Sequence, residues 1–136
     1  MSLAAASTAR YVQNTVTTAS PGRLLVMLYD RLALDLARAA EALDAGDRAR
    51  AHPQLLHAQD IVSELNSSLD HSVGWDGSKG LAALYTWLST ELVNVNIFGD
   101  LTRLRGCQSV VEPLRESWHQ ALEATSAAST DTRLVG

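Results

Sequence analysis

Few residues of this sequence have the types and spacing that catalysis or metal binding requires. Helical bundles that bind metals place glutamates and Glu-x-x-His pairs in their core, and one such pair occurs here, Glu116 and His119. At about 100° per residue, Glu116 points almost opposite to a core stripe centred near Leu114 and Trp118, and His119 lies about 125° from that centre. We interpret the pair as a solvated i,i+3 contact and predict no metal site.

Two other candidates are equally weak. His57, Asp60 and Glu64 share a loose face of a predicted helix, without a second cluster to complete a site, so we interpret them as ordinary polar surface. Cys107 has no neighbouring base and lies on an apolar stripe, which is typical of an inert, buried thiol. Phosphate-binding glycine loops and nucleophile elbows are absent. We predict no catalytic residue, no enzyme and no cofactor, with a metal- or ligand-binding bundle as an alternative.

Length and composition favour one soluble domain. The 136 residues, 46% of them hydrophobic, suffice for a single core over 1–136 without disulfides. The net charge of −4 argues against non-specific binding to nucleic acid or anionic membranes. A single cysteine suits a reducing compartment, and no apolar stretch has the length of a membrane span or a secretory signal. We therefore predict a cytoplasmic protein without membrane insertion.

Apolar residues recur at helical spacing in four segments, and no segment alternates as a strand does. Pro53 leaves two starts open for the second helix, near 52 or from 48 with a kink, and Pro113 is expected to bend the fourth helix or to confine its regular part to residues after 112. The first predicted helix spans about 21–45 and the third about 81–98. The second helix is predicted to end near 69 and the fourth near 126.

Four amphipathic helices joined by short loops predict an all-α fold, an antiparallel four-helix bundle, because each apolar stripe needs a partner. We assign the bundle to residues 20–126, a short N-terminal cap segment to 1–19 and a flexible tail to 127–136.

Several hydrophobic residues are not needed by this bundle, because they project about 100° or more from the predicted core stripes. Two interpretations are open. Loops, the N-terminal segment or a second copy of the chain cover these residues, or the residues form a groove that binds an amphipathic helix of a partner. The surplus residues are Val26, Met27, Leu34, Leu56, Trp87, Val93 and Ile97.

A motif connects these features to a known family. Residues 11–30 read YVQNTVTTASPGRLLVMLYD, with further matches at 58–66, 84–85, 96–97, Asp100 and 118–122. Over about 11–122 the chain resembles the flagellin export chaperone family FliS. The resemblance implies a cytoplasmic, non-enzymatic chaperone that binds the disordered C-terminal segment of flagellin, prevents its premature polymerisation and delivers it to the flagellar secretion apparatus, with the export gate as a second candidate partner.

The N-terminal segment has two possible roles. Tyr11, Val12 and Val16 are too apolar for a free tail and too few for a helix of their own. The segment is either a permanent cap on the bundle or a competitor that the client displaces from its groove. We therefore add Tyr11 and Val12 to the surplus residues as candidate flagellin-binding positions. A homodimeric scaffold without a client is the remaining alternative.

Overall fold

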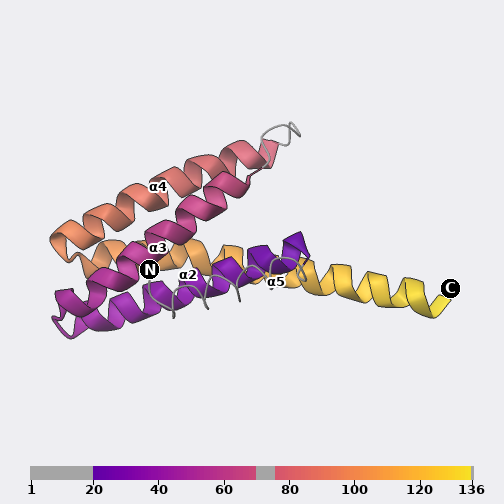
Figure 1. Ribbon diagram of the computed structural model, residues 1–136, viewed down its shortest axis with the longest axis horizontal. Helices are drawn as coiled ribbons and strands as arrows, with labels where there is room; N and C mark the ends of the chain where they lie inside the picture. Colours follow the sequence, from indigo (N-terminus) through magenta and orange to yellow (C-terminus); the bar gives the residue numbers. More distant parts are fainter. Residues whose placement is uncertain (1–19, 70–75, 136) are drawn as a thin grey trace, which may run out of the picture.

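The part of the chain that the structure describes forms four helices (Figure 1). The computed structural model describes residues 20–69 and 76–135, and it contains no strand within these ranges. This confirms the predicted all-α four-helix bundle, whereas the proposed cap segment 1–19 lies outside the described residues. The helices are α2 (Pro21–Asp44), α3 (Arg48–Ser68), α4 (Asp76–Phe98) and α5 (Leu101–Val135).

Local signals in the sequence set several of these boundaries. In α2, α3 and α5 a side-chain oxygen just before the first helical residue accepts a backbone N–H three residues on. Gly46 and Gly99 adopt positive φ angles of 72° and 62° where α2 and α4 end, a conformation that favours glycine. The capping pairs are Ser20 with Arg23 at 3.2 Å, Asp47 with Arg50 at 3.0 Å, and Asp100 with Arg103 at 3.0 Å.

Both internal prolines are accommodated without ending a helix. The helix α3 begins at Arg48 and contains Pro53, and α5 is helical through Pro113 to Val135. The expectations that α5 is regular only after 112 and ends near 126 are therefore wrong. Pro113 and Ser109 are both exposed, so solvent can hydrate the carbonyl that loses its helical hydrogen bond.

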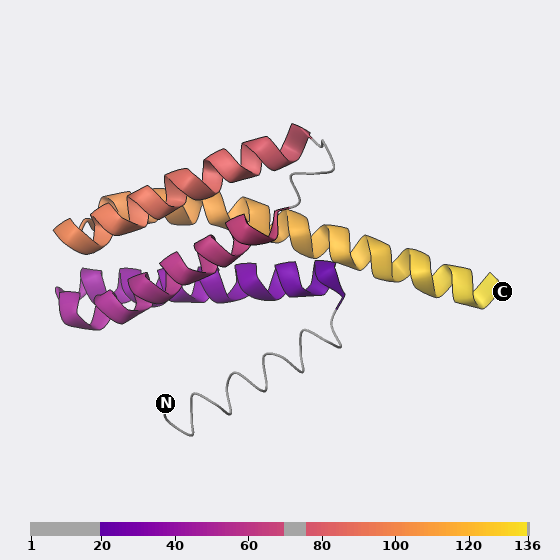
Figure 2. The same cartoon turned by 45° about the horizontal axis from the view of Figure 1, so that its top comes forward.

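Each helix packs against two neighbours, so that four interfaces enclose the core: α2 with α3, α3 with α4, α4 with α5 and α5 with α2. The start of α2, the end of α3 and the start of α4 lie at one end of the bundle, and α5 continues past them (Figure 2). The core is mostly aliphatic, with Leu32, Leu36, Leu92 and Leu104 fully buried.

The structure corrects the assignment of Val26 as a surplus residue, because only 5% of its surface is exposed. Contacts with both α3 and α5 bury α2 over an arc wider than one stripe. Tyr29 and Asp35 are buried on the same wide arc, although the leucine spacing does not mark them as core residues.

The burial pattern predicts a clear contrast between two leucines. Leu92→Ala should lower the free energy of unfolding by about 2 to 5 kcal/mol, because it removes buried methyl groups and leaves a cavity. Leu34→Ala, at a position 40% exposed, should lower it by well under about 1 kcal/mol. Urea unfolding followed by circular dichroism measures both, and equal losses would show that the assignment of the core is incorrect.

Candidate functional site

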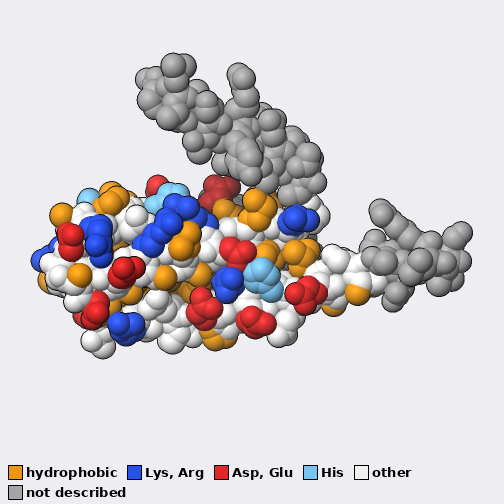
Figure 3. All heavy atoms as spheres, turned by 90° about the horizontal axis from the view of Figure 1, so that it is seen from below, with side chains coloured by type: hydrophobic (Ala, Val, Ile, Leu, Met, Phe, Trp, Pro, Cys, Tyr) orange, Lys and Arg blue, Asp and Glu red, His pale blue; other side chains and the backbone are white. Residues whose placement is uncertain are grey.

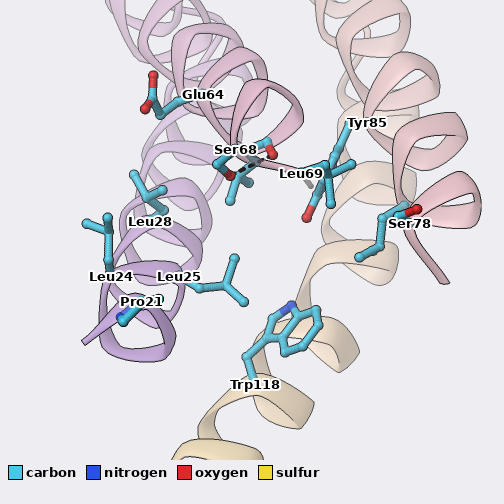
Figure 4. A pocket seen from close by; sticks show the side chains of 12 residues that line it. Pro21, Leu24, Leu25, Leu28, Glu64, Ser68, Leu69, Ser78, Tyr85 and Trp118 are labelled. Carbon is cyan, nitrogen blue, oxygen red and sulfur yellow. Dashed lines mark hydrogen bonds between the residues drawn. The ribbon is translucent and has the colours of Figure 1, made fainter. Parts of the chain in front are cut away.

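An apolar pocket opens at the end of the bundle where α2 and α4 begin and α3 ends (Figure 4). Its volume is about 460 Å³, and all four helices contribute to its wall. Half of the lining residues are leucines. The lining residues are Pro21, Leu24, Leu25, Leu28, Glu64, Leu65, Ser68, Leu69, Ser78, Leu81, Tyr85 and Trp118.

A second cavity of about 300 Å³ adjoins the first along α2 and α5. Leu25 and Trp118 line both cavities, so these two side chains form the partition between them. We call the two cavities together the end groove. The second cavity is lined by Ser20, Gly22, Leu25, Trp118, Ala121, Leu122 and Thr125.

The end groove arises from residues whose spacing predicts core positions. Leu25, Leu28, Leu81 and Trp118 pack against the core but are only partly buried. The apolar stripes continue to the ends of the helices, and a cavity remains between them there. Periodicity could not distinguish these wall positions from core positions, because both face the bundle axis.

A buried pair of tyrosines lies at the end groove, where Tyr85 is part of the lining and Tyr29 is not. The hydroxyls of Tyr29 and Tyr85 are 2.7 Å apart and hydrogen bonded, and the Tyr29 ring lies 6.1 Å from the Trp118 ring at a tilt of 56°. Burial, together with the hydrogen bond shared with Tyr29, raises the pKa of Tyr85. The Tyr85 hydroxyl is therefore paired within the protein, although its residue lines the groove.

Beside the groove, α2 and α5 are joined by a polar cluster. The Asp30 carboxylate accepts a hydrogen bond of 2.7 Å from Arg115 Nε, and the same oxygen lies 2.7 Å from His119 Nε2. Burial opposes ionisation of Asp30, but the hydrogen bonds from His119 and Arg115 outweigh it and lower its pKa. The interpretation of His119 as a solvated partner of Glu116 is wrong, because α5 turns His119 toward α2.

A second carboxylate joins α2 to α3. Asp35 is fully buried and accepts a 3.1 Å hydrogen bond from Arg31 Nε, while its other oxygen is hydrogen bonded to His57 Nδ1. His57 takes part in this interhelical contact but is itself exposed, so it lies on the polar surface that the sequence predicted. Asp60 and Glu64 are exposed.

The described residues offer little for catalysis. They contain no group of three or more His, Cys, Asp or Glu side chains that could hold a metal ion. Cys107 is fully buried, and burial, with a further effect of Glu91, raises its pKa to about 11, which makes the thiol a poor nucleophile. None of the described helices is both long and apolar enough to cross a membrane.

Of the seven surplus residues that lie in the described helices, six are exposed. Met27 and Leu34 share the outer face of α2, and Val93 and Ile97 are one turn apart on α4, but Leu56 and Trp87 lie on separate faces. Phe98, which the sequence reasoning missed, is 69% exposed. Tyr11, Val12 and Val16 lie outside the described residues. Figure 3 shows hydrophobic groups on one face of the molecule as small islands between charged side chains.

The sequence and the fold both match known proteins. The model of the family described as flagellar protein FliS matches residues 3–125, nearly the whole chain. The chain belongs to the FliS family. This match confirms the resemblance inferred from the motif at residues 11–30, and it extends to the helices that form the end groove.

Relatives of this FliS-family chain carry a consistent description. The flagellar secretion chaperone FliS of Bacillus subtilis is 35% identical over 114 residues, which cover 84% of each chain. The protein of the same description from Salmonella typhimurium is 28% identical over 80% of this chain and 82% of its own. A solved structure described as a flagellar chaperone from bacteria shares the fold, with a TM-score of 0.71 and 22% identity over 87% of this chain and 96% of that one.

The polar cluster of this FliS-family chain predicts a pH dependence of stability. Folding lowers the pKa of Asp30, so its ionised carboxylate stabilises the fold at any pH above the pKa of the unfolded chain, which is near 3.8. This stabilisation is lost as the pH falls through the lower pKa of the folded protein. Because Asp30 is part-exposed, Asp30→Asn should cost about 0.5 to 1 kcal/mol at pH 7, and this difference from wild type should shrink as the pH falls below the unfolded value near 3.8.

Chemical unfolding at pH 7, 5 and 3 measures this difference. The matched control is Asp60→Asn, because Asp60 is exposed and forms no ion pair with another residue that the structure describes. A pH-independent cost of Asp30→Asn, or an equal effect in the control, would contradict the assigned role of the cluster.

Proposed function

We propose that this protein is an export chaperone that binds the C-terminal segment of flagellin, prevents its premature polymerisation and delivers it to the flagellar secretion apparatus. The observation that supports this role best is the end groove, an open, largely apolar cavity with leucine as its commonest lining residue, to which all four helices contribute. Membership of the FliS family supports the identity of the client.

The groove has the chemistry that a disordered client requires. Ordering a flexible segment costs conformational entropy, and the burial of apolar surface offsets it at about 25 cal/mol per Å². Leucine walls supply such surface without demanding specific polar partners. The exposed hydrophobics outside the groove offer further contacts, and because they lie on three helices, a client that reaches them must extend around the bundle.

Other parts of the proposal follow from this role. The chaperone acts in the cytoplasm, where flagellin is made, it has no enzymatic activity, and the export gate is its second partner. A client-free homodimer is the main competing account, in which a second copy covers the apolar surface. Sedimentation of the free protein and of its mixture with flagellin separates the two, because the homodimer account requires a stable dimer without the client.

Charge placed in the groove or on the outer face of α2 should weaken client binding. Leu24 lines the end groove without packing against the core, and Met27 is 39% exposed. Leu24→Glu and Met27→Glu should each weaken the binding of a peptide of the flagellin C-terminal segment about tenfold or more, because a carboxylate would be buried without a partner. Isothermal titration calorimetry measures the affinity, and a negative heat-capacity change is expected.

Thr102→Glu serves as the matched control, since Thr102 is an exposed residue at the other end of the bundle. Its affinity should equal that of the wild type, and thermal unfolding should show all three variants folded. Normal binding by Leu24→Glu would place the client away from the end groove, and normal binding by Met27→Glu would exclude the outer face of α2.

The N-terminal segment is proposed to compete with the client. Ser20, which follows this segment, lines the second cavity, so the chain enters the bundle at the rim of the end groove. Deletion of residues 1–16 should therefore tighten binding of the flagellin peptide by about threefold to tenfold, because the client no longer displaces a tethered competitor. Unchanged or weaker binding would instead support a permanent cap outside the groove.

A further inference from the structure

Among the described residues, one buried polar group of the end groove lacks a hydrogen-bond partner. The indole Nε1 of Trp118 is buried, and no acceptor lies within hydrogen-bonding distance among the residues that the structure describes. Two other polar groups of the wall are paired: the Ser68 hydroxyl donates to the Leu65 carbonyl at 2.9 Å, and the Tyr85 hydroxyl is hydrogen bonded to that of Tyr29. Leaving a buried donor unpaired is unfavourable, so Trp118 requires a separate explanation.

The position of Trp118 gives it room to move. Its side chain extends from α5 between the leucines of α2 and the residues of α4, with the nitrogen on the side of the pocket (Figure 4). Cavities of about 460 and 300 Å³ flank the partition that it forms with Leu25. Both side chains are only partly buried. A change of rotamer at this partition can therefore uncover the nitrogen without disturbing the buried core.

We propose that Trp118 is a specificity-determining residue of the end groove, whose indole N–H donates a hydrogen bond to a carbonyl oxygen of the bound client. This inference rests on the proposed function and makes it more specific. A client segment that fits this site is apolar and has one carbonyl oxygen that is not already hydrogen bonded within the client. Such an oxygen occurs at the end of a helix, in an extended stretch or on an amide side chain. Within a helix the backbone carbonyls are already paired.

A single hydrogen-bond donor explains how an apolar groove can select one register of the bound client segment. Leucine walls accept any hydrophobic segment of suitable size, because the hydrophobic effect is not directional. A single donor in an apolar cavity is directional, and a client that places no acceptor there leaves the donor unpaired. The Tyr29 ring, 6.1 Å from that of Trp118, limits the orientations of the indole and so the position of the acceptor.

The test replaces the N–H group and leaves the ring shape unchanged. Trp75→Phe and Trp87→Phe are introduced together, so that Trp118 is the single tryptophan, and the protein is produced with either tryptophan or 3-benzothienylalanine, in which sulfur replaces the indole N–H. Both proteins are titrated with a synthetic peptide of the C-terminal segment of flagellin. Loss of the donor should weaken binding about fivefold to fiftyfold, with similar thermal unfolding of the two free proteins.

A second readout follows the indole proton directly. In the tryptophan protein labelled with ¹⁵N, the Trp118 Nε1–H signal should move downfield and exchange more slowly with water when the peptide is added. Equal affinities of the two proteins overturn the proposal, as does an indole signal that is already downfield in the free protein and does not change, since the acceptor then belongs to this chain. Absence of binding by the wild type overturns the proposed function itself. Trp87 is a candidate contact, so if only the doubly substituted protein fails to bind, the two amino acids are compared in the otherwise unchanged chain, where equal affinities again overturn the proposal.

Discussion

Both the core and the groove depend on α2, because this helix packs against α3 on one side and α5 on the other. Along its middle and end, α2 is buried over a wide arc that includes Leu32, Leu36 and Ala39. Near its start, Leu25 and Leu28 continue the apolar surface, but they face the end groove and stay partly exposed. One continuous stripe thus stabilises the bundle along most of its length and forms a binding surface at one end.

Two carboxylates of α2 fix the orientation of this helix relative to α3 and α5. Asp35 is fully buried and hydrogen bonded to His57 of α3, and Asp30 bonds to Arg115 and His119 of α5. Such pairs contribute modestly to stability, but they are directional, unlike the leucine contacts around them. They fix how α2 is rotated against both neighbours, and therefore which of its residues face the groove.

The sequence alone was sufficient for the family and the fold class, because the helical spacing and the motif at residues 11–30 are independent signals. It also identified most of the exposed hydrophobics, since a residue opposite the core stripe, such as Leu34, has no neighbour to cover it. Val26 and His119 were misplaced because an angle from one stripe takes no account of a second neighbouring helix. The end groove was missed for a different reason: its walls have core spacing, and only the packing of the helices shows where their contact ends.

The central claim is that the client binds in the end groove, and methyl NMR tests it most directly. The leucine methyl groups are labelled with ¹³C, and the protein is titrated with the C-terminal segment of flagellin. The account predicts that the signals of Leu24, Leu28, Leu69 and Leu81 shift and saturate with the peptide while that of Leu92, deep in the core, changes little. Saturable binding that leaves the groove methyls unchanged would contradict it.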